Sequence, residues 1–398
     1  MKQMSKPTKN KCPSCGTKGM NHFYEALNVP ISSSLMFTNH EDAINFPRGN
    51  VVLGFCKACG FISNNAFDAS KLDYSSLAPE EQGSSATFNA YANRLANRLI
   101  QTYDLHNKHI SEIGCGRGDF LALLCELGNN HGVGIDPSTV SGAVKSKALD
   151  HMTFIRDYYS NRYADQLGDF VSCRHTLEHI SNTAEFLSSI RSAIATNDTH
   201  VFFEVPDVSR ILQEVAFWDI YYEHCSYFNL GSLSRLFRHC NFEVANLTKD
   251  YFDQYLLIEA KPVSRKSRKI NEKEESIENT ATSVELFSAR SQSKLEQWKT
   301  ELKRIRVEKK KAIVWGSGSK CVGFMTTLGV ENEIQFIVDI NPNRHGKFIP
   351  GVGKQIVPPE FLKQYKPDTV IIMNPVYLNE IRQKLESMGL TAELIPCL

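Results

Sequence analysis

A glycine-rich turn between a short apolar strand and a helix constrains this fold more than any other feature of the sequence. Residues 109–120 are His-Ile-Ser-Glu-Ile-Gly-Cys-Gly-Arg-Gly-Asp-Phe, and a helical pattern follows over 120–127. The glycines let the backbone approach a ligand closely, and the start of the helix offers unpaired N–H groups. From about 80 to 262, helical patterns alternate with short apolar strands. This alternation predicts an α/β domain with a mostly parallel sheet.

Acidic residues around this turn indicate the ligand. Glu112 stands two places before the first glycine, where its carboxylate would repel phosphates but suits the cationic methionine end of S-adenosylmethionine (SAM). Asp136 ends the next strand about 20 residues after the glycines, where a carboxylate accepts both ribose hydroxyls. Asp157 follows a third strand, where an acid would meet the adenine amino group. This order predicts a class I methyltransferase core, with a nicotinamide-binding Rossmann unit as the alternative.

The expected cofactor-binding residues belong to these strand ends and their neighbours. They are Glu112, Gly114, Cys115, Gly116, Gly118, Asp136, Pro137, Asp157, Tyr158 and His175. His175 follows a fourth predicted strand, and strand ends on this side of an open α/β sheet line the ligand crevice. The alternative for His175 is packing near the cofactor without a direct contact.

Two C-x-x-C-G pairs near the N-terminus predict a metal site. Cys12 and Cys15 form the first pair, and Cys56 and Cys59 form the second. Two such pairs make a closed tetrahedral four-cysteine site, the usual structural arrangement for Zn²⁺. Because thiolates fill all four positions, we expect a structural ion rather than a catalytic one. Free thiols or a redox pair are the alternatives.

Changes in composition divide the chain into four segments. We expect a zinc-binding domain over 10–79, a SAM-binding methyltransferase core over 80–262, a charged linker and helix over 263–311, and a Rossmann-like domain over 312–398. Apolar residues recur at roughly helical spacing in the third segment, which predicts a long amphipathic helix.

The C-terminal segment carries a second glycine turn after an apolar strand. Gly316 and Gly318 form the turn, and Asp339 ends the next strand about 20 residues on, as in a dinucleotide site. The third glycine is displaced, because Gly323 comes five residues after Gly318 and not three. We expect a degenerate Rossmann-like domain that helps hold the substrate, with a true second nucleotide site as the alternative.

The overall composition argues against several classes of protein. A formal net charge of +1 argues against a broad nucleic-acid surface. No apolar run approaches the roughly 20 residues of a membrane-spanning helix, and the lysine-rich N-terminus lacks the apolar core of a signal peptide. We therefore expect a cytoplasmic monomer or homodimer that acts on a small molecule, without a nucleic-acid or membrane partner.

An aromatic segment, residues 217–228, follows the fifth predicted strand and contains a Glu-His pair. Tyr221, Glu223 and His224 belong to the sequence Ile-Tyr-Tyr-Glu-His, and His179 belongs to an earlier Thr-Leu-Glu-His-Ile segment. With the paired C-x-x-C and the Glu-Ile-Gly-Cys-Gly-x-Gly turn, these motifs make nearly the whole chain resemble the sugar C-methyltransferases. That family methylates nucleotide-linked keto-deoxysugars, and the resemblance implies that these four residues lie in the substrate site.

Carbon methylation needs a base that removes a proton alpha to a carbonyl and donors that stabilise the enolate. We expect His224 to be the base and Glu223 to orient it or to hold a substrate hydroxyl. Tyr221 and His179 are the expected donors. O- or N-methylation of another small polar metabolite is the alternative within enzymes, and a non-catalytic SAM- or partner-binding protein is the alternative outside them.

Two departures from the resembling family affect the expected substrate site. The family has a His-Gly-Gly segment after the core, whereas this chain has Tyr-Phe-Asp-Gln-Tyr over 251–255. Tyr74 is only a loose counterpart of a tyrosine in the loop ahead of the core. Both differences are expected where substrate is contacted, so the methyl-transfer machinery is better defined by the sequence than the substrate.

Overall fold

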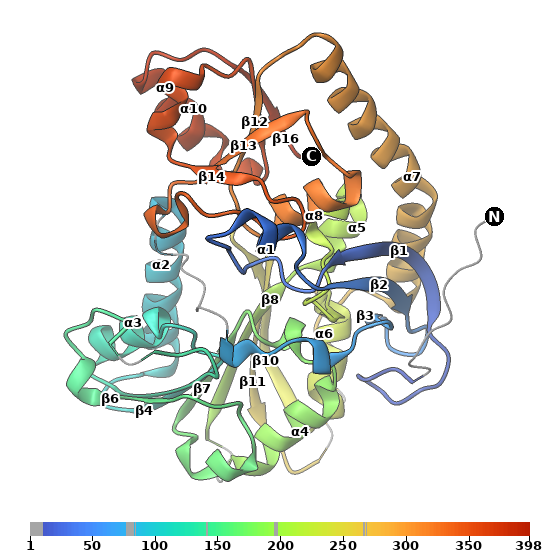
Figure 1. Cartoon of the computed structure of the whole chain (residues 1–398). Helices are drawn as coiled ribbons and strands as arrows, with labels where there is room; N and C mark the ends of the chain where they lie inside the picture. Colours follow the sequence, from blue (N-terminus) through green and yellow to red (C-terminus); the bar gives the residue numbers. More distant parts are fainter. Residues whose placement is uncertain are drawn as a thin grey trace.

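The computed structural model describes residues 11–76, 83, 85–140, 142–194, 198–265, 267 and 269–398, which form three β-sheets (Figure 1). Figure 1 shows the N-terminal strands beside the long helix α7 and the C-terminal unit above the central sheet. The expected boundary between the first two segments, at 79 and 80, lies outside the described residues.

The central sheet has seven strands in the order β10-β11-β8-β7-β4-β5-β6. The strands are β4 (His109–Ile113), β5 (His131–Ile135), β6 (Met152–Ile155), β7 (Phe170–Arg174), β8 (His200–Pro206), β10 (Phe242–Asp250) and β11 (Tyr255–Pro262). Strands β4 to β8 pair in parallel, and β11 joins β8 and β10 in antiparallel fashion. The strand order reverses at β4, between β5 and β7, and ligands bind at the carboxyl ends of strands at such a point.

Successive residues of a strand point to opposite sides of the sheet, and both sides of this sheet are apolar. Helices therefore cover both faces. Phe170 packs in the cluster that contains residues of α2 (Ala86–Tyr103) and α3 (Asp119–Gly128). Val171, the next residue, packs in the cluster that contains residues of α4 (Thr183–Ala193) and α6 (Leu230–His239). The predicted α/β architecture with a mostly parallel sheet is therefore confirmed.

The N-terminal sheet takes its fourth strand from much later in the sequence. It contains β1 (Asn21–Pro30), β2 (Arg48–Phe55), β3 (Ile62–Asn64) and β9 (Ser226–Tyr227), with α1 (His40–Ile44) between β1 and β2. Strand β9 belongs to the aromatic segment that follows β8 and α5 (Val208–Glu214), and it pairs with β3. This pairing brings the Glu-His pair of the core against the N-terminal unit.

The C-terminal unit is a five-stranded parallel sheet in the order β14-β13-β12-β15-β16. Its elements are β12 (Ala312–Trp315), α8 (Ser319–Leu328), β13 (Ile334–Val338), β14 (Gln355–Val357), α9 (Leu362–Tyr365), β15 (Thr369–Ile372), α10 (Leu378–Ser387) and β16 (Glu393–Pro396). The predicted Rossmann-like strand, glycine turn and helix correspond to β12, the turn after it and α8.

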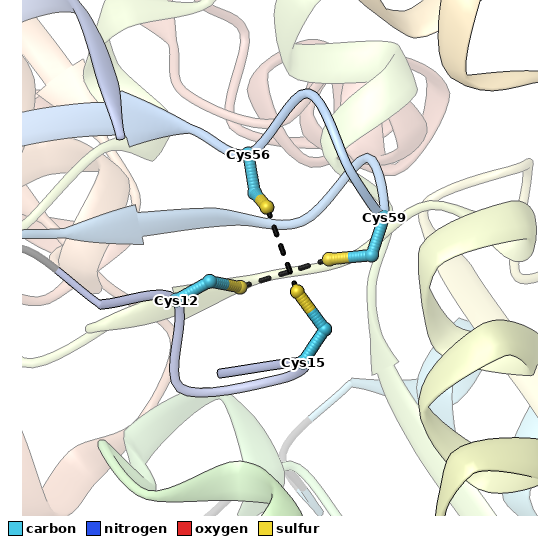
Figure 2. A group of neighbouring side chains, drawn as sticks. All are labelled: Cys12, Cys15, Cys56 and Cys59. Atoms are coloured by element: carbon cyan, nitrogen blue, oxygen red, sulfur yellow. Dashed lines mark hydrogen bonds between the residues drawn. The ribbon is translucent and has the colours of Figure 1, made fainter. Parts of the chain in front are cut away.

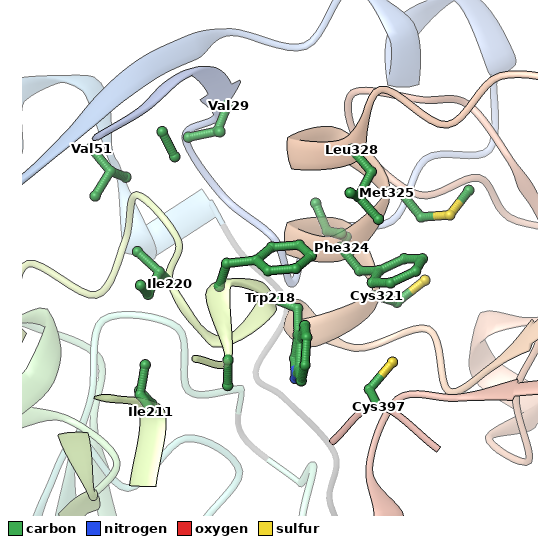
Figure 3. Close-up of a cluster of buried hydrophobic side chains, with 14 of the residues drawn as sticks. Val29, Val51, Ile211, Trp218, Ile220, Cys321, Phe324, Met325, Leu328 and Cys397 are labelled. Carbon is green, nitrogen blue, oxygen red and sulfur yellow. The ribbon is translucent and has the colours of Figure 1, made fainter. Parts of the chain in front are cut away.

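One hydrophobic cluster joins the three units (Figure 3). It includes Val29 of β1, Trp218 of the aromatic segment and Phe324 of α8, all three labelled in Figure 3. Full burial of a large apolar side chain contributes about 1.5–3 kcal/mol, so this cluster holds the units together. The predicted amphipathic helix is α7 (Ile277–Val307), whose buried Phe287 and other apolar residues join the same cluster. Neither α7 nor any other described helix is long and apolar enough to cross a membrane.

Candidate functional site

The turn between β4 and α3 has glycines where a side chain would not fit. Gly114 and Gly118 have φ angles of 72° and 87°, in the left-handed region that favours glycine. A Cβ on Gly114 would lie 1.9 Å from Oγ1 of Thr176, and a Cβ on Gly118 would lie 2.4 Å from the Phe154 ring. The turn is therefore packed tightly from behind, while Gly116 lies in the wall of a cavity.

Asp136 is tied to this turn by hydrogen bonds. Its Oδ2 accepts from the backbone N–H of Gly116 at 2.9 Å. Its Oδ1 accepts from the backbone N–H and the hydroxyl of Ser138 at 2.7 and 2.6 Å. These bonds hold the carboxylate in the cavity wall, at the end of β5 where the sequence predicts it.

Glu112 is a buried carboxyl group on β4 that also lines the cavity. Its Oε2 accepts a hydrogen bond from the backbone N–H of Leu121 at 3.0 Å. Burial raises the pKa of Glu112 to about 8. Because a nearby cation favours the ionised form of a carboxyl group, an ammonium ion at this position would lower that pKa again.

Asp157, the third predicted acid, does not line the cavity. Its carboxylate accepts hydrogen bonds from the Tyr163 hydroxyl at 2.6 Å and the Tyr158 N–H at 2.8 Å, and it pairs with Arg162. The Tyr163 hydrogen bond lowers the pKa of Asp157. Tyr158 lines the cavity instead, and its hydroxyl accepts from the backbone N–H of Tyr74 at 3.0 Å.

The cavity has a volume of about 900 Å³ and lies at the carboxyl ends of β4, β5 and β7. It brings together most of the residues that the sequence predicts for the cofactor and the substrate. Those in its wall are Glu112, Gly114, Cys115, Gly116, Asp136, Pro137, Tyr158, His175, His179, Glu223 and His224. Gly118, Asp157 and Tyr221 are not among the residues that line it.

A buried ionic network lies beside the cavity, centred on Glu204 of β8. Its Oε1 lies 3.0 Å from Nη2 of Arg174 and 2.6 Å from Nε2 of His175, and the Tyr91 hydroxyl donates to its Oε2 at 2.7 Å. Although burial opposes its ionisation, Arg174 and His175 lower the pKa of Glu204 to about 2. Burial also opposes charge on His175, but Glu204 and Glu178 raise its pKa to about 9. His175 is therefore a cationic ion-pair partner at neutral pH.

His179 is fixed at the other end of the cavity. It ends the 3-10 turn Leu177–His179, and its Nδ1 lies 3.1 Å from both the Tyr74 hydroxyl and the backbone oxygen of Glu223. Because a carbonyl oxygen only accepts, Nδ1 carries the proton in the contact with Glu223. Tyr74, the loose counterpart, thus lies in the cavity wall beside His179.

His224 and Glu223 reach the cavity from the aromatic segment. The rings of His224 and His179 meet edge to face with centroids 4.7 Å apart. Burial, together with the nearby His179, lowers the pKa of His224 to about 3, so its imidazole is neutral at physiological pH. Glu223 is buried, and its Oε1 accepts a hydrogen bond from the backbone N–H of Ser33 at 2.9 Å and another from the Ser33 hydroxyl.

Tyr221 supports His224 from outside the cavity. Its hydroxyl donates to Oδ1 of Asp219 at 2.9 Å, and its ring centroid lies 4.5 Å from that of His224. A hydroxyl engaged in this way does not reach a ligand in the cavity. The structure therefore favours a packing role for Tyr221 over the direct donor role that the sequence suggested.

Sequence reasoning did not single out Glu204 or Ser33. Glu204 lies in β8 near a strand end, the same signal that identified Asp136, and attention to every strand-end acid would have found it. Ser33 has no comparable signal, because its contact with Glu223 joins residues 190 positions apart in the sequence.

The 251–255 segment does not lie where the sequence suggested. Tyr251 and Gln254 are absent from the residues lining the cavity, and they contact the C-terminal unit instead. The Tyr251 and Tyr377 hydroxyls are 2.5 Å apart, and Gln254 donates from Nε2 to Oδ1 of Asn374 at 3.1 Å. The departure from His-Gly-Gly therefore bears on how the core and the C-terminal unit dock, because this hairpin turn contacts the connection between β15 and α10.

The four N-terminal cysteines converge on one point (Figure 2). Sγ of Cys12 lies 3.6 Å from Sγ of Cys59, Sγ of Cys15 lies 3.7 Å from Sγ of Cys56, and all four sulfurs are within 4.8 Å of one another. Zn–S bonds of about 2.3 Å in a tetrahedron place sulfurs about 3.8 Å apart. The donor set and its spacing thus fit a tetrahedral Zn²⁺ site.

Comparisons with known proteins agree with this geometry. Residues 87–247 match a methyltransferase domain, and residues 256–394 match a C-methyltransferase C-terminal domain. The C-methyltransferase NovU of Streptomyces niveus is 24% identical over 293 residues, which cover 68% of this chain and 67% of NovU.

Several solved structures also resemble part of the chain. A 1,6-didemethyltoxoflavin-N1-methyltransferase of Burkholderia thailandensis has a TM-score of 0.33 and 15% identity, covering 46% of this chain and 83% of that one. A magnesium protoporphyrin IX methyltransferase of Synechocystis PCC 6803 has a TM-score of 0.34 and 16% identity, covering 44% of this chain and 84% of that one. With the two domain matches and the C-methyltransferase relative, the chain is identified as a SAM-dependent methyltransferase that carries the C-methyltransferase C-terminal domain.

Proposed function

We propose that this enzyme methylates a carbon next to the carbonyl group of a nucleotide-linked keto sugar. One observation carries the proposal: a single cavity has the glycine turn and Asp136 in one part of its wall and His179, Glu223 and His224 in another. A C-methyltransferase relative and the resemblance of the sequence motifs to the sugar C-methyltransferases support a carbon acceptor.

The first part of the cavity would hold SAM, which supplies a methyl group on a positively charged sulfur. The Gly116 backbone allows close approach, and the fixed carboxylate of Asp136 would accept the ribose hydroxyls. Glu112 would face the ammonium group, which stabilises its ionised form. Tyr158 offers a ring to the adenine end of the cavity. These residues match the chemistry of the cofactor from its cationic end to its base.

In the second part, His224 would act as the base. Its neutral imidazole accepts a proton from the carbon alpha to the carbonyl, and the electron pair of that C–H bond forms the new bond to the methyl carbon as the S–CH₃ bond breaks. A pKa of about 3 makes His224 a weak base in the ligand-free cavity. The negative charge that develops on the substrate oxygen favours the protonated ring and raises its pKa during the step.

The neighbours of His224 would stabilise and orient the substrate. The Tyr74 hydroxyl lies beside His179 and can donate to the enolate oxygen, since a preorganised donor stabilises charge as it develops. Glu223, held by Ser33, would accept a hydrogen bond from a sugar hydroxyl. Tyr221 would act only through its ring contact with His224.

The proposal is tested by calorimetric titration with SAM, followed by methyl transfer to a panel of nucleotide-linked keto sugars. His224→Gln should lower kcat by about 10²–10⁴-fold, the usual contribution of a general base, while SAM affinity stays unchanged. His106→Gln, which changes an exposed histidine in the loop before β4, is the control. Transfer only to O- or N-nucleophiles, or full activity of the His224 variant, would reject the proposed reaction.

We also propose that the four-cysteine cluster binds one structural Zn²⁺. The ion would link the turn at Cys12–Cys15 to the turn at Cys56–Cys59, which flank β1 and β2 in sequence. Elemental analysis of protein purified without chelators should give about one Zn²⁺ per chain, since a closed four-thiolate site takes one ion. Cys15→Ser should lose the metal, and a metal-free wild-type protein would contradict the assignment.

A further inference from the structure

The glycine turn of the C-terminal unit is hydrogen-bonded to residues that follow the next strand. Oδ2 of Asp339 accepts hydrogen bonds from the backbone N–H and the hydroxyl of Ser317 at 2.9 and 2.5 Å. Nη1 of Arg344 donates to the same hydroxyl at 3.1 Å. The strand-end acid is thus bonded to its own turn, as Asp136 is bonded to the first turn, and the Arg344 side chain is a further partner of the Ser317 hydroxyl.

Lys320, in the first turn of α8, places its ammonium group in the contact between the C-terminal unit and the core. Its Nζ lies 3.1 Å from Oδ2 of Asp219 and donates to Oε1 of Gln254 at 3.0 Å. The close approach is fixed by Gly323 one turn later, because a Cβ there would lie 2.6 Å from the backbone oxygen of Trp218. The ammonium group of Lys320 is thereby held against the aromatic segment of the core.

Asp219 connects Lys320 to the candidate active site, because it is bonded to both Lys320 and Tyr221. It is 5% exposed, and its other oxygen, Oδ1, accepts the hydrogen bond from the Tyr221 hydroxyl. Arg210 of α5 also pairs with Oδ2, so Asp219 has two cationic partners, from the core and from the C-terminal unit. The Tyr221 ring in turn packs against His224.

We propose that Lys320 is a positioning residue of the active site, which fixes Asp219 and, through the Tyr221 hydroxyl and ring, sets the orientation of the His224 imidazole. In this domain a side chain from the first turn of α8 pairs with a carboxylate of the neighbouring unit. Ser319, the residue before Lys320, lines the cavity, so the same helix start also closes the site. The catalytic consequence rests on the proposed function, whereas the positional one does not.

The test compares Lys320→Met, which removes the charge but keeps most of the chain length, with Lys320→Arg, which keeps the charge. Lys384→Met is the matched control, because Lys384 pairs with Glu360 at the surface of the same unit. In protein labelled with ¹⁵N-histidine, the His224 imidazole signal is identified by its loss in His224→Gln. We expect Lys320→Met to shift that signal, Lys320→Arg to restore it at least in part, and Lys384→Met to leave it unchanged.

Kinetics supply the second readout. With an accepted substrate, Lys320→Met should lower kcat by about ten- to a hundred-fold, as misplacement of a catalytic group does, with the SAM dissociation constant unchanged. An unchanged His224 signal in folded Lys320→Met would overturn the proposal. If that variant fails to fold, Tyr221→Phe, which removes only the hydroxyl bond to Asp219, must shift the signal or the proposal fails. Since the spectra need no substrate, failure to find a sugar acceptor would reject the proposed function alone.

Discussion

The chain contains two glycine turns of the same local design, and they end in different surroundings. In each, a strand runs into glycines and a helix, and an acid at the end of the next strand accepts a backbone N–H of the turn at 2.9 Å: Gly116 to Asp136 and Ser317 to Asp339. The first turn lines the large cavity. The second places Lys320 against Asp219 of the neighbouring unit.

What lies opposite a glycine turn therefore decides what the turn does. Two residues before its first glycine, the first turn has the buried acid Glu112, whereas the second has the apolar Val314. The first turn requires left-handed backbone at Gly118, whereas Gly318 at the equivalent helix start has φ of −73°. The comparison predicts that substitutions in the first turn will affect cofactor binding. Substitutions at the matched positions of the second turn will affect the contact between the units instead.

The acids at the two strand ends give the largest expected difference. Asp136→Ala should weaken SAM binding by about a hundred-fold or more, because each hydrogen bond to a charged group contributes about 1.5–3 kcal/mol and Asp136 would accept two ribose hydroxyls. Asp339→Ala should leave SAM affinity unchanged. Calorimetric titration of both variants measures the effect. Equal losses would show that both turns bind the cofactor, and no loss in either would remove Asp136 from the site.

The glycines at the two helix starts give the next difference. Gly118→Ala should lower the free energy of unfolding by about 2–4 kcal/mol, from left-handed backbone strain and from overlap with the Phe154 ring. At Gly318, the nearest atom to a new Cβ is Nη1 of Arg344 at 4.0 Å, so Gly318→Ala should cost about 1 kcal/mol or less, the cost of losing a favourable N-cap residue. Urea unfolding of both variants measures this difference. Similar losses of unfolding free energy would mean that the two turns are equally constrained.

The sequence allowed prediction of both turns because their information is local. Spacing over a few residues was enough for the glycine turn, the cysteine pairs and α7, and the strand-end position of Asp136 followed from the same pattern. The direction of the Tyr221 hydroxyl and the docking of Gln254 were not predictable in this way. They depend on partners in other units, and a single sequence carries no periodicity that connects such positions.

Gly323 tests the contact that distinguishes the second turn. Alanine in a helix gains up to about 1 kcal/mol over glycine, but a Cβ 2.6 Å from the Trp218 backbone oxygen forces α8 away from the core. Overpacking of this kind costs about 1–3 kcal/mol, so we expect a net loss of about 1–2 kcal/mol with SAM affinity unchanged. Urea unfolding measures the stability and calorimetric titration measures the SAM affinity, with Gly318→Ala, at the N-cap of the same helix, as the control. A stabilised Gly323 variant would show that the contact is not tight.

The last prediction concerns Glu112, the acid that the second turn lacks. Its pKa of about 8 means that it binds a proton over the range in which the ammonium group of SAM is charged. If SAM binds the ionised form, affinity should rise close to ten-fold from pH 6 to pH 7, because the ionised fraction of such a group rises by about that factor. The sign follows from release of a proton on binding, which higher pH favours. Calorimetry in buffers of different ionisation enthalpy should show close to one proton released by the wild type and by Glu126→Gln, and none by Glu112→Gln. A Glu112→Gln variant with the wild-type pH dependence would place the proton elsewhere in the cavity, and the two turns would then differ in shape alone.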